Sequence, residues 1–372
     1  MNFETYPFEK LNLLLEPITP NSEYTPLSLT IGEPQFATPQ FIIDALNNNA
    51  GLLNKYPKTS GEAVLREGML NYLKNRFNLN LSNEQIIPTF GTREVLFNFP
   101  QFLLHDVKNS VMAYPNPFYQ IYEGAAKATN SKVIYLNLSK ENNFQPIVEE
   151  TLLEECHFVI INTPNNPTSS TMLMDELKKW VKLAQSYNFI LLNDECYIDL
   201  YLDKPLPSLL NASIEVANHD FKNILVINSV SKRSSAPGLR SGFIAGDAEI
   251  LKDYMTYRTY IGCASPLPLQ HAAAVAWADQ THVDEFRAKY IRNFELAKEI
   301  LGINPPLATF YIWLEVEDEV EFTTRLYKEY NLKVVPGSFL GRKGQGKGFV
   351  RLALVYEEEK TREALERIKK IL

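Results

Sequence analysis

A chain of 372 residues with 45% hydrophobic and 22% charged residues is typical of a soluble enzyme with a large core and two domains. A formal net charge of −7 argues against non-specific nucleic-acid binding, and no apolar run approaches the length that spans a membrane. The N-terminus shows no signal-peptide pattern and the three cysteines have no metal-ligand spacing, so we expect a cytoplasmic protein with reduced thiols and no bound metal.

The N-terminal region predicts an arm followed by two turns that each lead into a helix. The first thirty or so residues are polar and broken by prolines, which indicates an arm with one short helix. Gly32 lies in a predicted turn, and Thr38 with Pro39 predicts the N-cap and first residue of a helix. A second turn begins at Tyr56 and leads into an amphipathic helix through Leu73. On these patterns alone, Gly32 is a loop residue and Tyr56 a surface aromatic residue.

A short strand, a glycine turn and the start of a helix follow one another over Ile86–Phe97. Gly91 allows a close approach of the backbone, and Thr92 and Arg93 open the helix. The free N–H groups and positive dipole end of a helix N-terminus attract phosphate. A glycine and a threonine at a helix start are more often only a cap, so this motif alone does not establish an anion site.

From about residue 109, apolar segments alternate with amphipathic helices, which predicts βαβ units and an α/β fold with a mostly parallel sheet. The predicted strands are Val111–Tyr114, Val133–Leu138, Phe158–Asn162, Phe189–Asp194, Ile224–Asn228 and Phe243–Ala245, and the periodicity of Met172–Tyr187 predicts a helix. Farther along, Leu267–Ile300 predicts a helical bridge, and a smaller domain follows with strands at Phe310–Val316 and Lys333–Val335 and a helix at Glu321–Tyr330. We therefore expect three segments: residues 1–40 form an arm and part of the small domain, 41–265 the large domain, and 266–372 the inter-domain helix and the rest of the small domain.

Polar residues come directly after several of these strands, where ligands bind in open α/β sheets. Tyr119 follows the first strand, and an Asn-Pro turn that contains Asn166 follows the third. Asp194 ends a strongly apolar strand, where a buried carboxylate needs a partner, and Tyr197 lies three residues beyond it. The structural alternatives are a core tyrosine, an ordinary turn, and a carboxylate that caps the next segment.

Lys232 lies at the end of the next predicted strand, among the small and hydroxyl residues of Ser229–Gly242. Poor solvation there lowers the pKa of the lysine and frees its amine for a covalent bond to an aldehyde. Arg240 offers a planar fork suited to a phosphate, with the hydroxyls of Ser229 and Ser231 on the same side. These residues describe a site for pyridoxal 5'-phosphate (PLP), although Ser-x-Ser-Lys alone also fits a basic surface loop.

An arginine, Arg351, occurs inside the apolar segment Phe349–Leu354. A buried guanidinium requires an anion, whereas an edge strand with an outward charge is the alternative. The preceding segment Gly341–Gly348 fails as a phosphate loop, because Gly348 stands where Ser or Thr is needed, and we expect a mobile loop there.

The segment Ser229–Gly242 resembles the lysine signature of fold-type I PLP-dependent aminotransferases of class I/II. Together with Arg258-Thr-Tyr-x-Gly-Cys-Ala264, its wording is most similar to N-succinyldiaminopimelate aminotransferases of bacterial lysine synthesis. The similarity runs from about Ile31 to the C-terminus. It implies a large PLP-binding domain with a mostly parallel sheet flanked by helices, and a smaller α+β domain.

The resemblance also implies roles for individual residues. The catalytic residues would be Lys232, Asp194 and Tyr197; the cofactor-binding residues Tyr56, Gly91, Thr92, Arg93, Tyr119, Asn166, Asp194, Tyr197, Ser229, Ser231, Lys232 and Arg240; and the substrate-binding residues Gly32, Asn166 and Arg351. Tyr56 would reach the phosphate of the other subunit, which implies a homodimer with shared active sites. Ser169 stands where family members usually have glycine, and this departure leaves the exact turn open.

The implied activity is transamination between an amino acid and a 2-oxo acid, with ping-pong kinetics. The wording around Lys232 suggests glutamate or 2-oxoglutarate with N-succinyl-2-amino-6-oxopimelate. An aspartate or aromatic aminotransferase and a PLP-dependent C–S β-lyase are the alternatives, and a regulatory module without catalysis is disfavoured by Lys232 and Arg351. Arg258 and Arg93 are candidate contacts for a distal carboxylate of the substrate.

Overall fold

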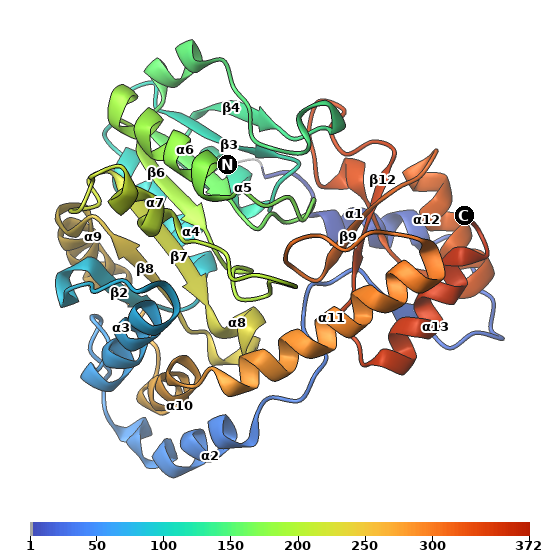
Figure 1. Ribbon diagram of the computed structural model, residues 1–372, viewed down its shortest axis with the longest axis horizontal. Coiled ribbons are helices and arrows are strands. Elements are labelled where there is room, and N and C mark those ends of the chain that lie inside the picture. The colour runs from blue at the N-terminus through green and yellow to red at the C-terminus, as the bar shows by residue number, and fades with distance from the viewer. Residues whose placement is uncertain (1–2) are drawn as a thin grey trace.

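A seven-stranded sheet forms the centre of the larger of two units in this computed structural model, which describes residues 3–372 (Figure 1). In spatial order its strands are β2 (Ile86–Thr89), β8 (Gly242–Gly246), β7 (Ile224–Ser229), β6 (Ile190–Asp194), β5 (Phe158–Asn162), β3 (Val111–Asn116) and β4 (Lys132–Asn137). The five strands from β7 to β4 run parallel, whereas β8 runs antiparallel to both of its neighbours. The predicted α/β fold with a mostly parallel sheet is therefore confirmed.

Helices cover both faces of this sheet, because successive strand side chains point to opposite faces. On one face, Val159 and Ile161 belong to a core with α3 (Ala63–Phe77), α6 (Met174–Tyr187), α7 (Leu209–Glu215) and α10 (Leu267–Ala278). On the other, Phe158 and Ile160 belong to a core with α4 (Thr92–Leu104), α5 (Ile121–Ala128) and α9 (Ala248–Ile261). Burial of strands on both sides explains their continuous apolar runs in the sequence.

The smaller unit is built from both ends of the chain (Figure 1). Its antiparallel sheet consists of β11 (Val335–Pro336), β12 (Phe349–Ala353) and β9 (Tyr311–Glu315), and β1 (Leu27–Ser28) pairs in parallel with β10 (Leu332–Lys333). Its helices are α1 (Pro7–Leu15), α12 (Glu319–Tyr330) and α13 (Glu358–Lys369). Short 3-10 helices elsewhere span Ala50–Asn54, Asn83–Gln85, Lys140–Asn142, Glu150–Glu155, Pro237–Leu239 and Gly337–Phe339.

The predicted helical bridge consists of two helices. The first, α10, packs against α2 (Gln40–Asn49) and α3, whereas the second, α11 (Thr281–Leu301), reaches the smaller unit and packs against α13 (Figure 1). By its packing, α10 lies with the larger unit. The domain boundaries after residues 40 and 265 stay a prediction.

Local sequence sets several helix starts, but one predicted cap is wrong. Asp247 caps α9 because its carboxylate accepts hydrogen bonds from two backbone amides of the first turn. The helix predicted to start at Pro39 begins one residue later, and Thr38 does not cap it. The Thr38 hydroxyl instead donates to the backbone carbonyl of Ser235, 2.8 Å away, so a tertiary contact replaces the local one.

Residues 3–372 contain neither a membrane-spanning helix nor a cluster of metal-ligating side chains. No helix in this range is long and apolar enough to cross a membrane. Nor does the range contain three His, Cys, Asp or Glu side chains grouped to hold a metal ion.

Candidate active site

A cavity of about 420 Å³ opens between the two units, at the carboxyl ends of β5, β6 and β7. This volume is typical of small-molecule sites, which measure roughly 300–1,000 Å³. The predicted site residues that line it are Gly32, Thr92, Arg93, Tyr119, Asn166, Asp194, Tyr197, Ser229, Ser231, Lys232, Arg240 and Arg351. The fold therefore brings together side chains that are more than 300 positions apart in the sequence.

The register of the central strands explains this convergence. Asn162 pairs with Asp194 across β5 and β6, and Asp194 pairs with Ile227 near the end of β7, where Ser229 follows. Parallel strands end at the same edge of a sheet, so their terminal polar residues share one site. Asn162 also fixes this edge, because its side-chain amide donates to the Asp194 backbone carbonyl at 2.8 Å.

Lys232 lies on α8 (Val230–Arg233), which follows β7 directly. Its Nζ donates to the backbone carbonyl of Gly32. Burial lowers the pKa of Lys232 from 10.5 to about 8, because loss of hydration penalises the charged amine. A substantial fraction of this amine is therefore neutral near physiological pH.

Asp194 places a buried carboxylate on the floor of the cavity. It is 5% exposed; its Oδ2 accepts from the Tyr122 hydroxyl at 2.9 Å and its Oδ1 from the Cys196 amide at 3.2 Å. Burial raises the pKa of Asp194, and these hydrogen bonds oppose that effect. Within residues 3–372, no basic side chain forms an ion pair with Asp194, so the carboxylate is suited to a cationic group of a ligand.

Hydroxyl and guanidinium donors surround the N-terminus of α4. Ser229 Oγ donates to Ser231 Oγ at 2.8 Å, and Thr92 and Arg240 line the same part of the cavity. Gly91, which precedes α4, has a φ of +77°, and a Cβ there would lie 2.4 Å from the Arg240 guanidinium. Only glycine thus allows this backbone to lie under Arg240.

Arg240 itself is held by neutral partners. Its Nη1 donates to the carbonyl of Pro237 at 2.9 Å and its Nη2 to the carbonyl of Phe90 at 3.4 Å. Among the residues that the structure describes, no carboxylate pairs with it. A cation, hydroxyls and a helix N-terminus together form a seat for an anion such as phosphate.

Arg351 is a second buried cation on the cavity wall, 4% exposed within β12. Its Nη1 donates to Asn166 Oδ1 at 2.8 Å and its Nη2 to the carbonyl of Thr30, whereas its Nε has no partner in the described chain. The alternative of an outward charge on an edge strand is therefore wrong. A buried guanidinium with neutral partners and an unused donor suits a carboxylate ligand.

Ser169, where the resemblance leads us to expect glycine, has a left-handed backbone conformation. Its φ is +60°, in the left-handed region that favours glycine. The Ser169 hydroxyl donates to the Tyr311 carbonyl at 2.9 Å and bonds the Thr309 hydroxyl at 2.7 Å. Left-handed backbone at a non-glycine residue costs about 1–3 kcal/mol, and two buried hydrogen bonds of about 1 kcal/mol each offset much of it.

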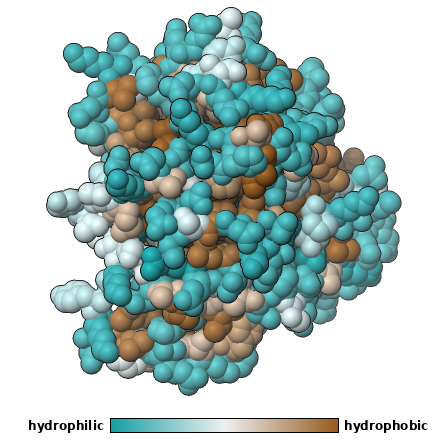
Figure 2. Space-filling model, turned by 60° about the vertical axis from the view of Figure 1, so that its left-hand side comes forward, coloured by the Kyte–Doolittle hydropathy of each residue, from teal (hydrophilic) through white to brown (hydrophobic). Residues whose placement is uncertain are grey.

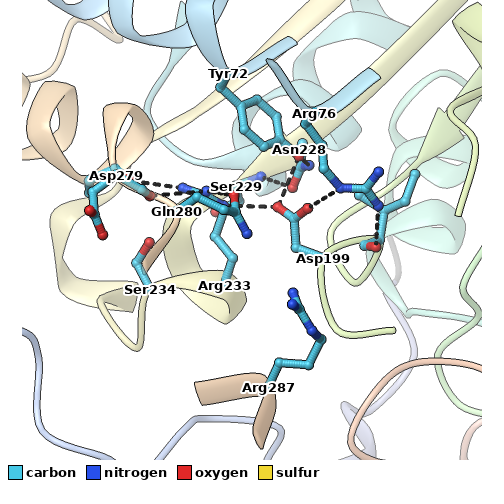
Figure 3. A network of polar contacts seen from close by, with 12 residues as sticks. Tyr72, Arg76, Asp199, Asn228, Ser229, Arg233, Ser234, Asp279, Gln280 and Arg287 are labelled. Carbon is cyan, nitrogen blue, oxygen red and sulfur yellow. Dashed lines mark hydrogen bonds and ion pairs between the residues drawn. The ribbon is translucent and has the colours of Figure 1, made fainter. Parts of the chain in front are cut away.

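A buried ionic network fixes the base of the lysine helix (Figure 3). Asp199 accepts from Arg233 Nε at 2.9 Å, from Arg76 Nε at 3.1 Å and from the Tyr72 hydroxyl at 2.9 Å. Arg233, only 1% exposed, also donates to a backbone carbonyl of α10. Because Arg233 follows Lys232 in the chain, the network holds α8 to α3 and α10.

Three predicted residues do not line the cavity, and one of them is Gly91, which lies against the Arg240 guanidinium. Tyr56 is fully exposed on the single chain, and its predicted role across a dimer interface stays a prediction. The prediction that Arg258 contacts a distal carboxylate is wrong, because Arg258 is fully buried and its Nε pairs with Glu94 Oε1 at 2.7 Å.

The glycine-rich segment before β12 is anchored rather than free. The Arg342 guanidinium donates to both carboxylate oxygens of Glu123, at 2.8 and 2.6 Å, and its amide donates to Asn116 Oδ1 at 2.8 Å. Leu340, at its start, lines the cavity.

Sequence reasoning missed several aromatic residues of the site. Tyr6 and Phe8 of the N-terminal arm and Tyr311 of β9 line the cavity, and Tyr122 binds Asp194 behind it. In the sequence each is one aromatic residue in an apolar or amphipathic segment, a pattern equally typical of the core. Only the aromatic residues near the predicted strand ends carried a local signal.

Known proteins resemble the whole chain. The family described as Aminotransferase class I and II matches residues 24–368. The crystal structure of aminotransferase AspB from Helicobacter pylori 26695 is 48% identical with a TM-score of 0.98, covering 100% of this chain and 99% of that one. An aminotransferase structure from Neisseria meningitidis Z2491 is 37% identical with a TM-score of 0.95, covering 100% and 98%. The LL-diaminopimelate aminotransferase of Aquifex aeolicus is 29% identical over 93% of this chain and 91% of its own.

Proposed function

Because the chain belongs to the class I and II aminotransferases, which depend on PLP, we propose that it transfers an amino group between glutamate and N-succinyl-2-amino-6-oxopimelate in lysine biosynthesis. Transamination between an amino acid and a 2-oxo acid is the activity of the family. The observation that carries the proposal is Arg351, a buried guanidinium with neutral hydrogen-bond partners that lines the same cavity as the Lys232 amine. One group suits the α-carboxylate of an amino acid, and the other suits chemistry at its amino group.

The residues of the cavity fit PLP. It needs an amine for its aldehyde, an anion for its ring nitrogen and donors for its phosphate, and the cavity contains a lysine with a lowered pKa, an unpaired carboxylate and a donor-rich helix N-terminus. We assign Lys232 to the aldehyde, Asp194 to the ring nitrogen, Tyr197 and Asn166 to the ring oxygen, Tyr119 to stacking on the ring, and Gly91, Thr92, Ser229, Ser231 and Arg240 to the phosphate end. Arg93, whose Nε donates to the Tyr119 hydroxyl at 3.0 Å, is left for the substrate.

Bound PLP supplies an aldehyde that bonds covalently to amines and a protonated ring that accepts negative charge. The Lys232 amine would hold the cofactor through its aldehyde. With a pKa of about 8, its Nζ would also be the base that takes the proton from the substrate Cα and returns it on the cofactor side. The Asp194 carboxylate keeps the proton on the ring nitrogen, and Arg351 orients the substrate through its α-carboxylate, for which Gly32 leaves space.

The identity of the substrate rests on further support. The basic residues that line the cavity are Arg93, Lys232, Arg240 and Arg351. If Lys232 and Arg240 serve the cofactor and Arg351 the α-carboxylate, Arg93 is the cation left for a second acidic group of the substrate. The Aquifex aeolicus relative is named for LL-diaminopimelate, which has the carbon skeleton of the proposed substrate. An aspartate or aromatic substrate, or β-elimination from a C–S amino acid, are the competing possibilities.

Steady-state kinetics separate these possibilities. We expect kcat/KM with 2-oxoglutarate to be higher for N-succinyl-LL-2,6-diaminopimelate than for aspartate or tyrosine, with parallel initial-rate lines. Arg93→Gln should lower kcat/KM about tenfold or more for the succinylated substrate and leave that for alanine, which has one carboxylate, unchanged. Faster turnover of aspartate or tyrosine would refute the assignment, and faster pyruvate release from cystathionine would favour the lyase.

We further infer a homodimer with shared active sites in the cytoplasm. Exposed apolar and aromatic side chains on the single chain include Leu53 at 73%, Tyr56 at 102% and Tyr260 at 88%. The face that carries α3 and α9 shows hydrophobic patches among hydrophilic side chains (Figure 2). Exposed hydrophobic patches mark interaction surfaces, and in a two-fold dimer both subunits would use the same patch.

A mixing experiment tests the sharing of sites. Lys232→Ala and Tyr56→Ala should each be impaired alone, but in a mixed dimer one site receives Lys232 from one subunit and Tyr56 from the other. Refolding the two variants together should restore up to about a quarter of wild-type activity, because half of the dimers are mixed and each has one intact site. Sedimentation as a monomer, or no recovery on mixing, would contradict the inference.

A further inference from the structure

Tyr311 is the first residue of β9 and lies where the smaller unit meets the cavity. It is 2% exposed, and its hydroxyl, its ring and its backbone each contact a different part of the site.

The hydroxyl of Tyr311 bonds the hydroxyl of Tyr197 at an oxygen–oxygen distance of 3.0 Å. It also lies close to Gly32, where a Cβ would come within 1.8 Å of it. Gly32 is therefore required by Tyr311 as well as by any ligand. The Tyr311 hydroxyl thus lies between Tyr197 and Gly32, whose carbonyl accepts from Lys232.

The direction of this hydrogen bond follows from the role assigned to Tyr197. A hydroxyl has one proton, so a Tyr197 that donates to the cofactor can only accept from Tyr311. Donors in such a chain polarise one another, and each bond strengthens the next. The Tyr311 hydroxyl then makes Tyr197 a better donor.

The ring of Tyr311 contacts the substrate side of the site. The Arg351 guanidinium carbon lies 4.5 Å from the centre of this ring, within the distance of a cation–π interaction. Hydrogen bonds to Asn166 and Thr30 hold the same guanidinium from its edge. The ring thus supports the face of Arg351 and leaves its Nε unused.

The backbone of Tyr311 is fixed to the turn that contains Asn166. The Ser169 hydroxyl donates to the Tyr311 carbonyl at 2.9 Å, and the Tyr311 amide donates to Thr309 Oγ1 at 3.0 Å. The bond from Ser169 joins the larger unit to the smaller one at the cavity wall. The position of the Tyr311 ring therefore depends on both units.

We propose that Tyr311 is a positioning residue with two separable actions: its hydroxyl polarises Tyr197 toward the cofactor, and its ring holds Arg351 for the α-carboxylate. The inference rests on the proposed function, because it acts through the roles assigned to Tyr197 and Arg351. The charged and titratable groups around Tyr197 and Lys232 are Tyr311, Cys196, Arg351, Glu33, Arg240 and Asp194. All of them except Tyr311 stay unchanged in the variants below.

The first experiment isolates the hydroxyl. PLP-loaded wild type and Tyr311→Phe are titrated with pH while the visible absorbance of the bound cofactor is recorded. A stronger hydrogen-bond donor at the ring oxygen favours loss of the proton that this oxygen shares with the Lys232 nitrogen. Weakening the Tyr197 donor should therefore raise the pH midpoint of the absorbance change. The loss of the Tyr311 donor should weaken the hydrogen bond from Tyr197 to the cofactor by about 10–30%. For a bond to a charged group this corresponds to a rise of roughly 0.1 to 0.7 pH unit in the midpoint. Tyr290→Phe is the matched control, because the Tyr290 hydroxyl is buried in the same aromatic cluster without a partner in the described chain.

The second experiment isolates the ring. Glutarate, a diacid without an amino or oxo group, is titrated into the PLP-loaded proteins, and the KM for glutamate is measured in parallel. Tyr311→Phe should keep the Kd for glutarate and the KM for glutamate within about twofold of wild type. Tyr311→Leu should raise the Kd for glutarate by about 2- to 30-fold. Where glutarate binds too weakly to measure, the same increase is expected in the KM for glutamate. Tyr311→Met replaces Tyr311→Leu if the latter does not fold.

The outcomes distinguish this inference from the proposed function. A wild type that forms no visible band with PLP overturns the proposed function. A normal wild-type titration with an unshifted midpoint in Tyr311→Phe overturns the action of the hydroxyl. Unchanged Kd and KM in the variant without the ring overturn the action on Arg351.

Discussion

Replacement of the site lysine tests the electrostatics of the cavity without any catalytic assay. Lys232→Met keeps the length and apolar character of the side chain and removes its charge. In the cofactor-free protein, we expect this variant to be more stable than wild type at pH 7. The reason is that burial penalises the Lys232 ammonium, as its lowered pKa shows.

The size of this effect follows from the pKa of the buried amine. The pKa falls from 10.5 in a solvated lysine to about 8 in the folded protein. One pKa unit corresponds to about 1.4 kcal/mol, so the charged amine costs the folded state about 3 kcal/mol below pH 8. Between pH 8 and 10.5 the folded protein has lost this proton while the unfolded chain keeps it, and the stability of wild type therefore rises with pH.

The assay is urea unfolding of the cofactor-free proteins at pH 7 and pH 10, at equal protein concentration. The advantage of Lys232→Met over wild type should shrink by about 2 to 3 kcal/mol from pH 7 to pH 10. All other titrating groups are common to both proteins and cancel in this difference. Lys204→Met, at an exposed lysine, is the control and should show no such change. A difference that is constant with pH would refute the argument that Lys232 is buried at a cost.

Three further substitutions test other parts of the structure. Asp199→Ala leaves Arg233 and Arg76 without their anion and should lower the free energy of unfolding by about 3–5 kcal/mol. Glu155→Ala, at an exposed ion pair, is the control and should lower it by less than about 1 kcal/mol. Urea unfolding measures both. Ser169→Ala keeps the left-handed backbone and loses two hydrogen bonds, so it should cost about 1–3 kcal/mol, more than Ser169→Gly, and the reverse order would contradict our account of the turn. Gly91→Ala should displace the guanidinium above it and weaken PLP binding about tenfold or more in a fluorescence titration, whereas Gly51→Ala, with open space around it, should bind PLP as wild type does.

The central sheet and its functional edge could be predicted because both depend on local sequence. Continuous apolar runs mark strands buried on two faces, and the polar residues that end them mark the edge where a ligand binds. Asp194, Ser229 and Lys232 follow such runs directly, so their convergence required no knowledge of distant contacts. The same reasoning identified Arg351 as a charge that the strand around it could not tolerate without an anion.

The rest of the site could not be predicted because tertiary contacts decide it. Tyr311 and Tyr122 are aromatic residues in apolar surroundings, and only the packing of the two units shows that their hydroxyls bond Tyr197 and Asp194. Arg258 is the opposite case. It was a candidate contact for a distal carboxylate of the substrate, but a carboxylate of α4 pairs with it in the core.

The charges of the cavity are kept apart although they would be more stable in contact. Asp194 has no cationic partner within residues 3–372, while Arg240 and Arg351 bond to neutral groups and Lys232 donates to a carbonyl. Partners at ion-pair distance would remove much of the desolvation cost that raises the pKa of Asp194 and lowers that of Lys232. A ligand with a cationic nitrogen at one end and a dianionic phosphate at the other satisfies Asp194 and Arg240 together, and an α-carboxylate satisfies Arg351. On the proposed assignments, the separation lowers the stability of the cofactor-free protein and leaves these three side chains available to the ligand groups. Removing the charge of Lys232 is therefore expected to stabilise that protein.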